Sequence, residues 1–99
     1  MDIKAFQEYV KSENSRWSHT PETRVLYLMS EVGELSDEVL NLLFAKKDTT
    51  SSGISDIEEQ LAMEIYDVIW NAVDLANQLN IDLSDAFEKK QNFNKNRWD

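Results

Sequence analysis

The chain has 99 residues, of which 19 are acidic and 10 are basic, and its formal net charge is −9. A chain of this length is expected to form one domain, over residues 1–99, with a small core that association between copies would help to stabilise. The absence of cysteine and the single histidine exclude disulfides, thiolate nucleophiles and histidine-rich metal sites.

The composition also limits the partners and the location of the protein. The acidic charge predicts that no nucleic acid binds, since a nucleic-acid-binding protein normally presents a basic face to the phosphates. We expect no membrane association, because no apolar run approaches membrane-spanning length and the N-terminal segment is too polar for a secretory signal. A cytoplasmic location follows by elimination.

Helical periodicity extends over most of the sequence, without the alternating pattern that is typical of strands. A first helix is predicted at about residues 2–12, and its inward-facing residues are Ile3, Phe6 and Val10. A second helix is predicted to begin at Thr20-Pro21, because proline at the first helical position loses no hydrogen bond that the helix needs. Its apolar stripe consists of Val25, Leu28, Val32, Leu35, Val39 and Leu42.

The polar run DTTSSG at residues 48–53 predicts a linker, after which Ser55 and Glu58 form a capping-box pattern for a third helix. The apolar stripe of that helix consists of Leu61, Ile65, Val68, Ala72, Leu75 and Leu79. Asp82 can cap a shorter fourth helix. We therefore predict an all-α fold, a bundle of about four helices per chain that oligomerisation completes, in which two long helices carry the acidic motifs.

Acidic side chains accompany the apolar stripe of both long helices. Glu31 and Glu34 each precede a stripe residue in the second helix, and Glu64 and Asp67 do the same in the third. The row in the third helix continues as Asn71 and Asp74. Since one residue turns a helix by about 100°, these side chains are predicted to lie beside the core seam. If the two long helices pack together, the two carboxylate pairs can face each other.

Four carboxylates in one half-buried place repel one another and are costly to desolvate, so a cation is expected among them. Oxygen ligands without imidazole or thiolate suit Mg²⁺, with Mn²⁺ as a substitute. A di-iron bundle would need Glu-x-x-His pairs, which His19 cannot supply from outside the long helices.

The alternative interpretation is that these carboxylates pair with lysine or arginine of a neighbouring helix, as is common in bundles. Basic residues are scarce for such pairing. None lies between Arg24 and Lys46, and none lies between Lys47 and Lys89. The basic C-terminal segment or a second chain would have to provide the partners.

The sequence resembles the MazG-like family of all-α nucleoside triphosphate pyrophosphohydrolases in segments that follow the family's order. EVGEL and the later EIYDV resemble its Glu-x-x-Glu and Glu-x-x-Asp motifs, at Glu31, Glu34, Glu64 and Asp67. Three further segments are similar to the dCTP pyrophosphatase branch: RWSHTPE at 16–22, NIDL at 80–83 and KQNFNKNRW at 90–98. Asn71 departs from that branch, which usually carries a tyrosine there.

The resemblance implies Mg²⁺-dependent hydrolysis of a nucleoside triphosphate between its α and β phosphates, which yields a nucleoside monophosphate and pyrophosphate. Glu31, Glu34, Glu64 and Asp67 would hold the metal. Glu34, with Glu31 as the next choice, would orient or deprotonate the attacking water. We expect a preference for deoxynucleotides and a role in cleaning the nucleotide pool. A phosphoribosyl-ATP hydrolase of the same fold agrees less well with the dCTP-like segments.

Near the C-terminus, Lys90, Asn94 and Arg97 lie at helical spacings of four and three, so they share a face that could bind phosphate oxygens. The alternative is a solvated basic helix end, which the helix dipole favours in any case.

For the base, the resemblance implies contacts from Trp17, His19, Asn71 and Trp70, with the tryptophan rings stacking on it. Trp17 could instead attach its loop to the bundle, and Trp70 could instead pack in the core or in an interface between chains.

A non-enzymatic function is compatible with the same residues, namely a helical interaction module whose acidic face binds a basic partner. A catalytic site needs all four carboxylates, whereas a binding face tolerates the loss of any one. Whether the protein is an enzyme or an interaction module, we predict a homodimer or homotetramer. One small bundle leaves apolar surface uncovered, and the resemblance implies association as well.

Overall fold

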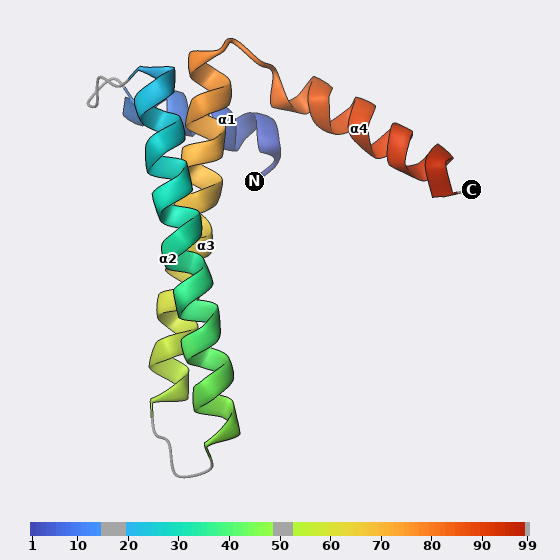
Figure 1. Cartoon of the computed structure of the whole chain (residues 1–99). Coiled ribbons are helices and arrows are strands. Elements are labelled where there is room, and N and C mark those ends of the chain that lie inside the picture. The colour runs from blue at the N-terminus through green and yellow to red at the C-terminus, as the bar shows by residue number, and fades with distance from the viewer. Residues whose placement is uncertain (15–19, 49–52, 99) are drawn as a thin grey trace.

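The computed structural model describes residues 1–14, 20–48 and 53–98. Within these ranges the chain forms the helices α1 (Ile3–Asn14), α2 (Pro21–Lys47), α3 (Ile54–Gln78) and α4 (Leu83–Trp98), and no strand (Figure 1). The predicted all-α fold is thereby confirmed. None of these helices combines the length and the apolar character that crossing a membrane requires.

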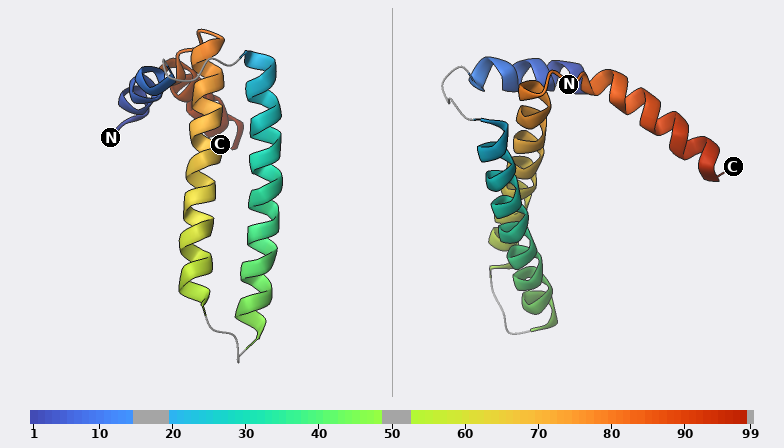
Figure 2. Two further views of the ribbon diagram at one scale, coloured as in Figure 1. Left: turned by 90° about the vertical axis from the view of Figure 1, so that its left-hand side faces the viewer. Right: turned by 45° about the horizontal axis from the view of Figure 1, so that its top comes forward.

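The two long helices, α2 and α3, lie side by side as an antiparallel hairpin (Figures 1 and 2). Helix α1 crosses the end of the hairpin where α2 begins and packs against α3. Helix α4 contacts α1 and then extends away from the hairpin. The chain is consequently open, with extents of 49 × 44 × 25 Å and a radius of gyration of 16.8 Å, against about 12.6 Å for a compact domain of this length.

Local signals set most of the helix ends. The hydroxyl of Thr20 accepts a hydrogen bond from the Thr23 amide at 3.2 Å, and Pro21 follows, as predicted. An oxygen of Asp82 accepts from the Ser84 amide at 3.0 Å at the start of α4, as predicted. The capping box at Ser55 is wrong: α3 starts at Ile54 and has no side-chain cap. Gly53 takes a left-handed φ of 85°, which only glycine adopts freely, and this turns the chain into the helix earlier.

The seam between α2 and α3 keeps every second position of the predicted stripes, and at the other positions it uses the residue that comes one earlier in the sequence. The less exposed residues of α2 alternate between leucines and polar or small residues, namely Arg24, Leu28, Glu31, Leu35, Glu38, Leu42 and Ala45. On α3 the less exposed residues at the same heptad spacing are Ile57, Leu61, Glu64, Val68, Asn71, Leu75 and Gln78, and Val73, Asp74 and Ala76 are buried in addition. Glu31, Glu38 and Glu64 therefore lie within the seam, at the positions that a coiled coil gives to core residues, whereas Glu34 and Asp67 are exposed beside it.

This shift leaves an apolar row on the outer side of each long helix. Val25, Val32 and Val39 of α2 are 37–45 % exposed, although the sequence predicts that they point inward. Ile65 and Leu79 of α3 are exposed in the same way. The prediction fails here because helical periodicity shows that a row is apolar but does not show which neighbour the row contacts.

The described core is small and lies where α1 crosses the hairpin. The buried apolar residues are Val10, Val73 and Ala76, and the buried polar residues are Arg24, Asn71 and Asp74. Of the residues predicted to face inward on α1, Val10 is fully buried, whereas Ile3 and Phe6 are only partly covered.

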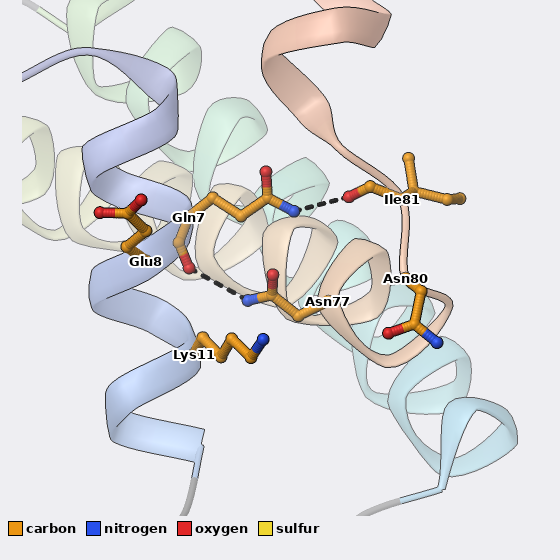
Figure 3. Close-up of a pocket in the computed structure, with 6 residues that line it drawn as sticks. All are labelled: Gln7, Glu8, Lys11, Asn77, Asn80 and Ile81. Atoms are coloured by element: carbon orange, nitrogen blue, oxygen red, sulfur yellow. Dashed lines mark hydrogen bonds between the residues drawn. The ribbon is translucent and has the colours of Figure 1, made fainter.

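Polar contacts hold α1 in place. The Gln7 side-chain amide donates to the Ile81 carbonyl at 2.7 Å, and the Asn77 side-chain amide donates to the Gln7 carbonyl at 3.2 Å (Figure 3). These residues and Lys11 line a polar hollow. It lies roughly 20 Å along α3 from Glu64, at 1.5 Å per residue, and is therefore separate from the acidic residues of the seam.

Candidate metal centre

Three glutamates meet across the middle of the hairpin seam. Carboxylate oxygens of Glu31 and Glu34, from α2, and of Glu64, from α3, all lie within 4.8 Å of one another. The predicted meeting of acidic residues from the two long helices is therefore observed for these three. Asp67 lies outside this group of atoms, and its side chain is exposed one turn further along α3.

The carboxylates of this cluster repel one another. Burial raises the pKa of Glu31, and the charges of Glu34, Asp67 and Glu64 raise it further. The Oε2 atom of Glu64 is buried and has no hydrogen-bond partner within the described residues. A buried polar atom of this kind needs a proton, water or ion.

Basic side chains do not relieve this repulsion within the part of the chain that the structure describes. The ion pairs there include Arg24 with Asp74, Lys46 with Glu58, and Lys89 with Asp85, and none of these three involves Glu31, Glu34 or Glu64. Neutralisation by neighbouring basic side chains is therefore not found for Glu31, Glu34 and Glu64. Clustered carboxylate oxygens, one of them buried and unpaired, fit a hard divalent cation such as Mg²⁺.

A second polar group lies in the same seam, closer to α1. The buried Asn71 amide accepts a hydrogen bond from Nη1 of Arg24 at 2.5 Å and donates from Nδ2 to the Asp67 carbonyl at 2.9 Å. Nε of Arg24 lies 2.5 Å from Oδ2 of the fully buried Asp74, as an ion pair. The Gln78 amide donates to the same Asp74 oxygen at 3.0 Å.

Aromatic rings flank the Arg24 guanidinium. Its central carbon lies 5.3 Å from the ring centroid of Trp70 and 5.8 Å from that of Tyr27, distances typical of cation–π contacts. Sequence reasoning gave Arg24 no role. Two features of the sequence could have indicated a role for Arg24. It precedes Glu31 by two helical turns, and Asp74 continues the polar row of α3.

The residues predicted to bind phosphate lie elsewhere. Lys90, Asn94 and Arg97 lie between the middle and the end of α4, which extends away from the hairpin (Figures 1 and 2). Lys90 places its ammonium 4.8 Å from the ring centroid of Phe93 on its own helix. One chain therefore does not bring these residues to the acidic cluster. Trp17 and His19, predicted to contact the base, lie outside the described residues.

The fold and the cluster define a class of protein: an all-α helical hairpin with an acidic site between its two long helices. Comparison with known protein families identifies it further, because residues 19–98 match the MazG nucleotide pyrophosphohydrolase domain. The chain belongs to this family, and the predicted resemblance is confirmed at that level. No curated protein and no solved structure matches the chain significantly. Family membership indicates nucleotide pyrophosphohydrolase activity and a nucleotide substrate, in a family that generally depends on divalent metal ions.

Proposed function

We propose that the protein is a Mg²⁺-dependent nucleoside triphosphate pyrophosphohydrolase that cleaves between the α and β phosphates. The observation that carries this proposal is the acidic cluster, in which three carboxylates from two helices lie within 4.8 Å without a basic partner among the described residues. Such a cluster is costly in a protein of this size unless a cation occupies it. Membership of the MazG family supports the reaction type.

The carboxylates divide into two roles. Mg²⁺ held by Glu31, Glu34, Glu64 and Asp67 would supply charge neutralisation and activation of a water molecule, and Mn²⁺ could replace it. Glu31 and Glu64 are the partly buried members, and their position in the seam suits them to hold the ion. Glu34 is exposed, so its carboxylate can reach a water molecule on the open side and orient or deprotonate it. Glu31 is the second choice for this base.

The part of the seam between the acidic cluster and α1 suits the nucleoside of the substrate. Asn71 and Trp70 follow Asp67 by about one helical turn, so a nucleotide with its phosphates at the carboxylates can extend its base toward them. Trp17 and His19 belong to this proposed base site by resemblance to the dCTP pyrophosphatase branch. That resemblance also supports a deoxynucleotide substrate and a role in cleaning the nucleotide pool.

The phosphate-binding residues require a second copy of the chain. Because Lys90, Asn94 and Arg97 extend away from the hairpin, they would reach an acidic cluster that belongs to a neighbouring subunit. The accessible surface of 7473 Å² supports association, since a folded monomer of 11.5 kDa should expose only about 5,800 Å². Covering the excess on two chains gives roughly 3,300 Å² in total, within the range of obligate homodimers. The outer apolar rows are the surface available for it, in a homodimer or homotetramer.

A panel of nucleoside triphosphates, incubated with Mg²⁺ and then with chelator, tests this proposal. Chromatography should show monophosphate and pyrophosphate only when the metal is present, and the relative rates should rank the bases and sugars. Diphosphate and phosphate as products would contradict the cleavage position. No turnover of any member would favour the non-enzymatic alternative, an interaction module that uses the acidic face.

A further inference from the structure

The ion pair between Arg24 and Asp74 occupies a large part of the very small buried core. Asp74 is 0 % exposed and Arg24 is 5 % exposed, so both charges are removed from water. Replacing a buried ion pair with apolar residues is often neutral or stabilising, which makes the pair a poor device for stability alone. The pair is also incompletely satisfied. Oδ1 of Asp74 has no hydrogen-bond partner among the described residues, and the contact of Arg24 Nε with Asp74 is a close ion pair without hydrogen-bond geometry.

The position of the pair connects it with the proposed active site. Arg24 lies two turns from Glu31 on the same face of α2, a rise of roughly 10 Å. On α3, Asn71 lies between the acidic cluster and Asp74, and it contacts both Arg24 and the carbonyl of Asp67. Asn71 thus connects the Arg24–Asp74 ion pair with the turn of α3 that carries Asp67.

Arg24 determines which way the Asn71 amide faces. A guanidinium only donates hydrogen bonds, so the group of Asn71 that faces it must be the oxygen. The nitrogen is thereby directed toward Asp67, where one of its N–H groups binds the backbone carbonyl. An amide nitrogen carries two N–H groups. The second N–H makes no hydrogen bond within the described residues and is therefore available as a donor to a ligand.

The same guanidinium holds an aromatic ring. Its central carbon lies 5.3 Å from the Trp70 ring centroid, and this ring is only partly buried. Ion pairing with Asp74 fixes the guanidinium, and the guanidinium in turn limits the movement of both Trp70 and Asn71. These are the two described residues at the nucleoside end of the proposed site.

We propose that Arg24 is a positioning residue for the nucleoside end of the substrate, where it fixes the Asn71 amide as a hydrogen-bond donor and orients the Trp70 ring. This inference rests on the proposed function. The ligand group that faces Asn71 is accordingly a hydrogen-bond acceptor of the base or sugar. Asp74 anchors the guanidinium and does not touch the substrate.

The test uses the double variant Arg24→Met with Asp74→Ala, which removes both charges and so leaves neither buried alone. We expect it to fold and to keep the increase in melting temperature that Mg²⁺ produces. The KM for the best substrate should rise about tenfold, the usual effect of losing one well-placed hydrogen bond, whereas kcat should change little. Arg24→Lys should also raise KM, because an ammonium cannot bind Asp74 and Asn71 as a planar fork.

A matched control is Lys46→Met with Glu58→Ala. It likewise replaces the basic residue with methionine and the acidic residue with alanine, at an exposed ion pair near the other end of the hairpin, where the charged atoms are 3.8 Å apart. We expect wild-type KM and kcat. Wild-type KM in the folded Arg24/Asp74 double variant, or full rescue by Arg24→Lys, would overturn the positioning role.

A measurement without substrate separates this inference from the proposed function. In ¹⁵N-labelled protein the side-chain amide protons of Asn71 should exchange slowly, and in the Arg24/Asp74 double variant they should exchange fast and shift. Unchanged Asn71 signals would overturn the inference even if the enzyme is active. Absence of turnover by the wild type on every triphosphate would refute the proposed function, and with it the assignment of Arg24 to a substrate site.

Discussion

Replacing Glu31 with glutamine should stabilise the metal-free protein while removing its response to Mg²⁺. Glu31 is partly buried, and two neighbouring carboxylates reach within 4.8 Å of it. Glutamine keeps the size of the side chain and removes the charge. The variant therefore relieves repulsion in the cluster at the same time as it removes a proposed metal ligand.

The size of the effect follows from the geometry. Two unit charges 4.8 Å apart repel by about 0.9 kcal/mol even with the dielectric constant of water. Two neighbours thus contribute somewhat less than about 2 kcal/mol after screening by salt, and we expect a net gain of about 1 kcal/mol. A gain of that size raises the melting temperature of a domain of this length by about 4–8 °C.

Thermal unfolding with EDTA and with Mg²⁺, at one fixed protein concentration, measures both effects. Wild-type protein should be stabilised by Mg²⁺, by about 2.7 kcal/mol when the ion is at a hundred times its dissociation constant, whereas Glu31→Gln should melt higher than wild type in EDTA and respond weakly to the ion. Glu59→Gln is the control, because it removes an exposed charge on α3 outside the cluster. A Glu31→Gln variant that melts lower in EDTA, or that keeps the full response to Mg²⁺, would refute the reasoning.

Further predictions concern catalysis, assembly and a helix cap. Glu34→Gln and Asp67→Asn should each reduce kcat at least about 100-fold with unchanged circular dichroism; retained activity in both would contradict the assignment of the metal site. Val32→Lys or Val39→Asp should place a charge in the outer apolar row and shift sedimentation velocity toward the monomer; an unchanged oligomer would exclude this row as the interface. Thr20→Ala removes the cap of α2 and should cost about 1 kcal/mol, seen as a lower melting temperature. An unaltered melting curve would mean that the cap contributes nothing.

Local signals in the sequence predict the helices well. Thr20 and Pro21 act within the first turn of α2, and Asp82 acts within the first turn of α4, so neither depends on tertiary structure. The start of α3 is the exception, because a capping box at Ser55 competes with the left-handed conformation that Gly53 supplies. The direction of α4 is not encoded locally, since it depends on how α1 packs.

The face that each long helix turns to its neighbour is harder to predict. Helix α2 has a valine row and a leucine row, and either is compatible with helical periodicity. The chain buries the leucine row together with the acidic positions and leaves Val25, Val32 and Val39 exposed. A single sequence does not distinguish contacts within a chain from contacts between chains.

Helical spacing likewise predicts only part of the candidate site. Spacing predicts that Glu31 and Glu34 can face Glu64 and Asp67 if the two long helices pack together, and the structure brings together three of these four residues, without Asp67. The contact between Arg24 and Asp74 joins residues 50 positions apart, and it depends on the relative shift of α2 and α3 along their axes. Helical spacing within each element carries no information on that shift.

The most direct test of the central claim is ³¹P nuclear magnetic resonance of one nucleoside triphosphate during incubation with the wild-type protein, first with Mg²⁺ and then with excess EDTA. We expect monophosphate and pyrophosphate signals to grow together in Mg²⁺ and to stop growing when the ion is chelated. Growth of diphosphate and inorganic phosphate signals, or equal rates with and without the ion, would contradict this expectation.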